Sequence, residues 1–202
     1  MPENKAIVKQ RMGAATGIAA PILAFVCILT AITSFPKFSW TNNALSDLGI
    51  IPGITGSLFN FGLYASGFLG LYFALFGLFS FLGNSRVGKI GASLFAATSM
   101  ALISIGVFNE SFHGIHFAVS VAFFVLAPIS MFIITWAFQL AHQTKMAVFT
   151  VLIGIAAAFP WILQFSFNYV PNVAIPEFLS GLAVSIWTVT LSFKMIKQTN
   201  TN

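Results

Sequence analysis

The stretch that decides the fold is Ile115–Ala137, IHFAVSVAFFVLAPISMFIITWA, which contains no Asp, Glu, Lys or Arg. An apolar run of about 20 residues spans the hydrocarbon core of a bilayer when it is helical, and lipid offers no partners to an irregular backbone. Similar runs lie on both sides of it. The full set is Ala15–Phe35, Leu58–Leu82, Ile90–Val107, Ile115–Ala137, Met146–Phe167 and Glu177–Ile196. We therefore expect an all-α bundle of six transmembrane helices.

Composition supports a membrane protein and excludes several other classes. Of the 202 residues, 58% are hydrophobic and 6% are charged, whereas soluble domains have about 25% charged residues. Six spans use most of the chain, so residues 1–202 are expected to form a single transmembrane domain. The basic residues are scattered and form no nucleic-acid-binding face. The single cysteine, Cys27, excludes a disulfide framework.

The distribution of basic residues predicts the orientation of the bundle. With six crossings, eight Lys and Arg residues fall on one side and only Lys37 on the other. The positive-inside rule then places both termini in the cytoplasm, with the protein in the cell membrane. The first run is longer than a signal-peptide core, so we expect it to be a retained helix. The eight residues are Lys5, Lys9, Arg11, Arg86, Lys89, Lys145, Lys194 and Lys197.

Small residues recur at helical spacing on two of the expected helices. Such faces let helix backbones approach closely in lipid. They predict close packing within the bundle or, alternatively, a homo-oligomer, and membrane lipids are the other expected partners. The two sets are Gly62, Ser66, Gly70 and Ala74 on the second helix and Ser93, Ala97 and Ala101 on the third.

The link before the fourth helix carries the first group of candidate site residues. Asn109 is expected to cap this helix, with Glu110 in its first turn. Glu110, His113 and His116 are spaced i, i+3, i+6, which would place neighbours on one side of a helix. A carboxylate and two imidazoles are ligands for a divalent metal such as zinc, so these three form a candidate metal site. The alternative is that Glu110 only caps the helix and His113 lies in the interface.

The first outer link, residues 36–57, contains a second group. In Asn42-Asn43-Ala44-Leu45-Ser46-Asp47-Leu48-Gly49 we expect a short interfacial helix, capped by an Asn and closed by Gly49 in the left-handed conformation. Ser46 and Asp47 would be held at the interface. Local capping alone is the alternative reading.

Later segments add polar residues at the same depth. Asn60 lies near the outer end of the second helix, and Gln164 and Asn168 follow Pro160, an expected kink, in the fifth. Pro176 and Glu177 are expected to open the sixth helix. We predict that these side chains share a pocket below the outer headgroups. Asp47, Glu110 and His116 are its candidate catalytic residues, and its binding residues are Asn43, Ser46, Asn60, His113, Gln164, Asn168 and Glu177.

Several of these motifs together resemble one known membrane family. They are Asn43–Gly49 (NALSDLG), Phe59–Leu63 (FNFGL), Phe108–Glu110 with His116–Ala118, and Pro176-Glu177 with Trp187. Over essentially the whole chain the sequence resembles the prokaryotic family called domain of unknown function 998. The resemblance implies a six-helix membrane protein with Ser46, Asp47, Asn60, Glu110, His116 and Glu177 as marked polar positions, and it implies no activity.

Three functions remain open from the residues alone. The pocket is expected to bind a metal or a lipid. It could also belong to a membrane hydrolase or transferase that activates water or a hydroxyl with Asp47, Glu110 and His116. Finally, the polar cluster could only lock helix ends together in a structural protein or a small-solute transporter.

Overall fold

The chain folds into a bundle of long helices in the computed structural model, which describes residues 2–201 and the side chains from Ile7 to Thr199. Six helices are long and apolar enough to cross a membrane, and the described residues contain no strand. The all-α, six-span prediction is confirmed. The helices are α1 (Pro2–Thr33), α2 (Ile54–Tyr72) with η2 (Phe73–Leu78) and α3 (Phe79–Phe81), α4 (Arg86–Val107), α5 (Gly114–Leu140), α6 (Thr144–Phe167) and α7 (Ala174–Thr201).

Most helices extend beyond the predicted apolar runs. α1 begins at Pro2 rather than Ala15, and α7 runs from Ala174 to Thr201 rather than from Glu177 to Ile196. The reason is that hydropathy marks only the part of a helix that lies in lipid, whereas the backbone hydrogen bonds continue into polar turns. The second span is one continuous helix from Ile54 to Phe81, with a π-helical segment at Phe73–Leu78.

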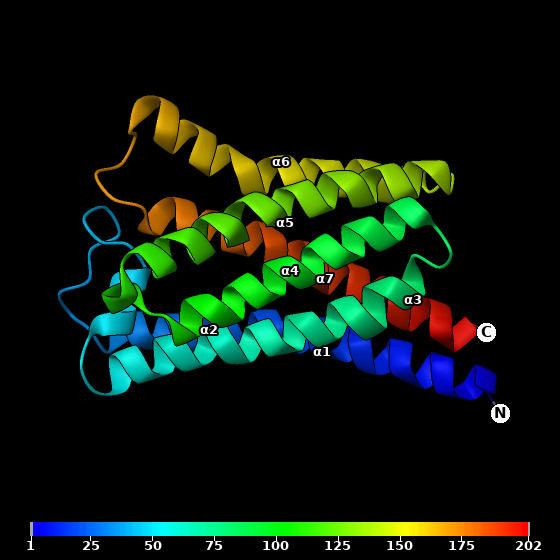
Figure 1. Ribbon diagram of the computed structural model, residues 1–202, viewed down its shortest axis with the longest axis horizontal. Helices are drawn as coiled ribbons and strands as arrows, with labels where there is room; N and C mark the ends of the chain where they lie inside the picture. Colours follow the sequence, from blue (N-terminus) through cyan, green and yellow to red (C-terminus); the bar gives the residue numbers. More distant parts are fainter. Residues whose placement is uncertain (1, 202) are drawn as a thin grey trace.

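The six spans are arranged as a closed ring. Each packs against the next along the chain, and α7 packs against α1. Both termini lie at the same end of the bundle, which we call the terminal end (Figure 1). The links 34–53, 108–113 and 168–173 lie at the opposite end. We call it the carboxylate end, because Asp47, Glu110 and Glu177 lie in or next to these links. The first two contain the short 3-10 helices η1 (Ser46–Ile50) and η3 (Glu110–Phe112). Which end faces the cytoplasm stays a prediction, based on the eight basic residues at the terminal end.

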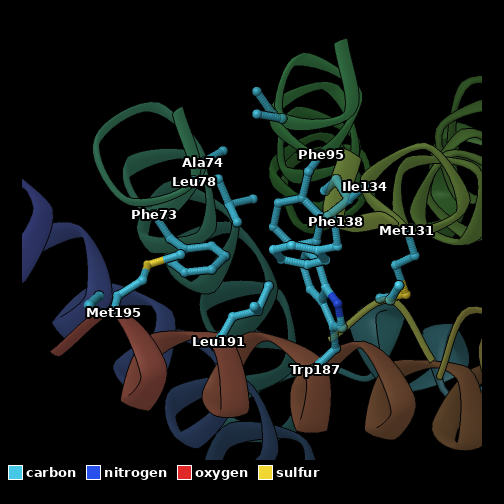
Figure 2. Packing of buried hydrophobic residues seen from close by; sticks show 14 residues of the cluster. Phe73, Ala74, Leu78, Phe95, Met131, Ile134, Phe138, Trp187, Leu191 and Met195 are labelled. Carbon is cyan, nitrogen blue, oxygen red and sulfur yellow. The ribbon is translucent and has the colours of Figure 1, made fainter. Parts of the chain in front are cut away.

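The core at the terminal end is apolar and closely packed (Figure 2). Trp187 of α7 is fully buried and packs against Phe95 of α4, with ring centroids 5.2 Å apart. Its indole N–H donates to the Thr150 hydroxyl of α6 at 3.2 Å, which satisfies two buried polar groups at once. The cluster also contains Ala14 of α1 and Phe73 of η2, so it joins all six spans.

Glycines allow α2 to approach both of its neighbours. A Cβ on Gly62 would lie 2.4 Å from Cβ of Cys27 in α1, and one on Gly106 of α4 would lie 2.6 Å from the backbone N of Tyr64. Ser66 and Ala74 are also buried within the chain. The small-residue face of the second span therefore packs inside the bundle. A homo-oligomer stays a prediction.

Candidate functional site

The carboxylate end is held together by hydrogen bonds between links that are far apart in sequence. The backbone oxygen of Thr41 accepts from the N–H of Asn172, and that of Asn43 accepts from Ala174, both at 3.0 Å. The Asn172 side chain also donates to the oxygen of Asn42 at 3.0 Å. These contacts fix the first link, residues 34–53, against the start of α7.

Asp47 organises the first link from inside it. Its Oδ2 accepts from the Asn43 side chain at 2.7 Å and from the Ala44 N–H at 3.1 Å, while Asn43 Oδ1 accepts from the Ser39 N–H at 2.9 Å. The predicted short helix is present at Ser46–Ile50. Its capping by an Asn was wrong, because Leu45 is the N-cap and makes no side-chain bond. The Asp47 side chain instead holds the two residues before the N-cap, Asn43 and Ala44.

The predicted left-handed Gly49 was also wrong. Among the described glycines, positive φ occurs at Gly53 and Gly83. Gly49 matters for a different reason: its carbonyl accepts from the side chains of Asn60 at 2.8 Å and Asn109 at 3.4 Å. An added Cβ would lie 2.6 Å from Asn60 Oδ1. The predicted binding residue Asn60 therefore anchors η1 to α2.

Glu110 lies on η3 and not on the long helix that follows. Asn109 is an N-cap as predicted, with its side chain accepting from the Ser111 N–H at 3.2 Å, but it caps η3. The chain then turns at His113, whose φ is 38°, and α5 begins at Gly114. The prediction that Glu110, His113 and His116 share a helix was therefore wrong. His113 is exposed, whereas His116 is buried.

Glu110 and Asp47 form a carboxyl pair. Burial, a side-chain hydrogen bond to Asp47 and the charge of Asp47 together raise the pKa of Glu110 from 4.5 to about 7. One oxygen of Glu110, Oε2, is buried and has no hydrogen-bond partner. Two carboxyl groups placed close together cannot both ionise at low cost, so Glu110 keeps its proton to a higher pH than a solvated carboxyl group does.

Glu177 of α7 brings a third carboxyl group to this end. Its Oε2 accepts from the Leu45 N–H at 2.6 Å, and the Ser46 N–H also donates to the carboxyl group. Glu177 lies close enough to Glu110 and Asp47 for the three groups to repel one another. The prediction that Pro176 and Glu177 open this helix was off by two residues, because α7 begins at Ala174, but Glu177 does lie in its first turn.

His116 is buried, but its ring contacts groups other than the carboxyls. Nδ1 lies 2.8 Å from the carbonyl oxygen of Phe108, and Nε2 lies 3.4 Å from the Ser120 hydroxyl. A carbonyl only accepts, so Nδ1 carries the proton and the ring holds the end of α4. Within the described residues, no group of three or more His, Cys, Asp or Glu is placed to hold a metal ion. A metal site stays a prediction that this geometry does not favour.

The two predicted binding residues at the end of α6 form hydrogen bonds that shape its C-terminus. The Gln164 side chain is buried and donates to the carbonyl of Val170 at 2.9 Å. Asn168 is exposed and ends the helix in the left-handed conformation, donating its N–H to the Gln164 carbonyl at 2.9 Å. Both shape the turn that leads to Glu177, and neither lines the cavity described next.

A cavity of about 140 Å³ lies inside the ring, next to the carboxylate end. Its walls come from α1, α2, α4, α5 and α7 and are almost wholly apolar, with Phe25, Phe59 and Phe123 among them. Ser46 of η1 and Glu177 are part of the wall where it meets the first link. A Cβ added to Gly181, also in the wall, would meet no atom within 4 Å. The hydroxyl of Ser66, farther along the wall, is buried without a hydrogen-bond partner.

Sequence reasoning identified Glu177 and Ser46 but missed the cavity. Cavity residues such as Phe95, Leu102 and Gly181 lie on faces that look like ordinary helix packing surfaces. The only sequence signal was the presence of small residues, such as Gly70 and Ser99, at facing positions of α2 and α4. It also missed Asn109 as a partner of Gly49.

Comparison with known proteins gives a family match but no activity. A family model described as "Protein of unknown function (DUF998)" matches residues 18–194. No curated protein and no solved structure matches the chain.

Proposed function

Because the chain belongs to the DUF998 family of membrane proteins of unknown function, its activity has to be argued from the site, and we propose that it binds a single-chain amphiphile. The apolar chain would occupy the cavity, and the polar head would lie at the carboxylate end beside Glu177 and Ser46. The observation that carries the proposal is the cavity itself, lined by apolar helix faces and bordered at one end by a carboxyl group.

The size of the cavity favours a chain over water. One water needs about 10–15 Å³ by the same measure, so a cavity of about 140 Å³ has room for a much larger guest. Apolar cavities stay dry and accept hydrocarbon guests. Its wall follows α7 from Glu177 to Thr188, roughly 16 Å at the helical rise. That is close to the roughly 15 Å depth of one lipid leaflet.

A second candidate is a reaction at the head of the same ligand. Glu110, beside Asp47, has a pKa of about 7, and a group that exchanges a proton near neutral pH can act as a general acid or base. His116, the third predicted catalytic residue, is bound to Phe108 and Ser120 instead. A hydrolase or transferase of this site would therefore rely on the two carboxyl groups.

The test fills the cavity with a larger side chain and measures whether a bound amphiphile is lost. Wild type, Gly181→Leu and Gly114→Leu are purified in a non-ionic detergent, and native mass spectrometry measures bound mass before and after solvent extraction. A Cβ at either glycine meets nothing within 4 Å, but only Gly181 lines the cavity. We expect a bound amphiphile on wild type and Gly114→Leu and its loss from Gly181→Leu. Equal occupancy of both variants, or no bound species on wild type, would contradict the proposal.

A further inference from the structure

The cavity contains an acidic group without a basic partner. Glu177 lines the wall, and Asp47 and Glu110 lie close enough to add to the negative potential there. Lys37, the lysine of the first link, is exposed. Among the side chains that the structure describes, no Lys or Arg forms an ion pair with these three carboxyl groups.

Within the part of the chain that the structure describes, the groups that donate to Glu177 are backbone dipoles. Backbone N–H groups of Leu45 and Ser46 donate to its carboxyl group, and both come from η1. Neither imidazole at this end is among the described lining residues: His113 is exposed, and the His116 ring is bound to the Phe108 carbonyl. Ionising a carboxyl group that has no counter-charge beside an apolar space at membrane depth is costly.

The groups next to the cavity also have a common hydrogen-bonding character. Carboxylate oxygens only accept, and the Ser46 hydroxyl can accept as well as donate. The described lining residues include no arginine or lysine, and the N–H groups of Leu45 and Ser46 already donate to Glu177, so a phosphate or carboxylate head at this end would be repelled by the carboxyl groups.

We propose that the ligand head is a hydrogen-bond donor with positive charge, so that the cavity selects a long-chain amine over a long-chain alcohol and both over a fatty acid or a phosphate ester. An ammonium placed at the Glu177 end of the cavity would donate to the carboxyl group and supply its missing counter-charge. The inference rests on the proposed function, because it assigns the head of the amphiphile whose chain fills the cavity.

The experiment compares probes that share one chain and differ in the head. Dodecylamine, dodecanol and dodecanoate are titrated onto wild-type protein that has been stripped of bound species, in a non-ionic detergent at pH 7.5. Apparent affinities are read by native mass spectrometry. We expect dodecylamine to bind at least tenfold more tightly than dodecanoate, with dodecanol between them. Gly181→Leu measures non-specific uptake of each probe.

Glu177→Gln tests the assigned group. The Gln oxygen still accepts from the Leu45 N–H, so the link stays anchored, but the charge is gone. We expect the amine preference to fall to within about threefold of the alcohol while dodecanol binding is retained. If the variant fails to fold, the ranking of the three probes on wild type still decides.

The outcomes separate the inference from the proposed function. Dodecanoate binding as tightly as dodecylamine, with both lost in Gly181→Leu, would overturn the head assignment and leave the cavity proposal standing. An amine preference unchanged in Glu177→Gln would also overturn it. No probe binding to wild type above the Gly181→Leu level would overturn both.

Discussion

Replacing Glu110 by Gln should remove a pH-dependent loss of stability. Folding raises the pKa of this carboxyl from 4.5 to about 7, through burial first and the neighbouring Asp47 second. A carboxyl with a raised folded pKa binds its proton more tightly in the folded state. Its contribution is fully present below pH 4.5 and is lost as the pH rises through about 7.

The magnitude follows from the size of the shift. At 1.36 kcal/mol for each pKa unit, the change from 4.5 to about 7 corresponds to about 3 kcal/mol. Glu110 is partly exposed, and solvent screening reduces this to about 2 kcal/mol. For a chain of this size that is a fall in Tm of roughly 4–8 °C between pH 5 and pH 8. In Glu110→Gln the amide donates to Asp47 at every pH, so the part of the fall that comes from Glu110 should disappear.

The assay is thermal unfolding in a non-ionic detergent, followed by tryptophan fluorescence, to which the fully buried Trp187 contributes. Ser111→Ala, on the same turn as Glu110 but without a carboxyl, is the control and should keep the wild-type profile. A wild-type Tm that is constant from pH 5 to pH 8, or an equal fall in Glu110→Gln, would show that the carboxyl pair does not share a proton.

Three further changes test the packing that supports the site. Gly106→Ala should destabilise the bundle by about 2 kcal/mol, because the new Cβ would meet backbone atoms of α2 at 2.6–2.7 Å; the Tm of Gly114→Ala, where the space is open, should change far less. Trp187→Phe should cost about 2 kcal/mol by thermal unfolding, because it leaves the buried Thr150 hydroxyl without its donor. Glu177→Leu should speed hydrogen exchange in residues 41–50, because it removes the oxygen that accepts from the Leu45 N–H. Glu177→Gln keeps an acceptor and should leave these residues protected. Equal exchange in the two variants would refute this.

The fold could be predicted from sequence because lipid imposes a simple rule. Apolar runs such as Ile115–Ala137 must be helical, and six of them return the chain to the side on which it began. Helix ends were less predictable. The turn at His113, which separates Glu110 from α5, depends on a positive φ. The residue types in this link did not predict it. A pattern of i, i+3, i+6 is informative only if the helix is continuous.

The members of the site could be predicted in part. Scarcity of charge in a membrane protein identified Asp47, Glu110 and Glu177, and the structure brings these three together. It does not bring His116 to them by any hydrogen bond among the described residues. The hydrogen-bond partners of Asn60 and His116 could not be predicted, because they are main-chain carbonyls, those of Gly49 and Phe108. A sequence does not reveal which carbonyls the local turns leave free to accept.

The hydrogen bonds at the carboxylate end explain why a structural role and a binding role are compatible. Asp47 uses one oxygen to hold the first link, and Glu177 uses one to attach that link to α7. A purely structural lock would be served equally well by amides, which carry no charge and cost less to bury. Keeping three mutually repelling carboxyl groups beside an apolar cavity has a physical reason only if something with the opposite charge, or a proton, enters there. Replacing all three by their amides should therefore raise the Tm at pH 8 while abolishing the amine preference; a triple variant that loses stability instead would favour the structural role.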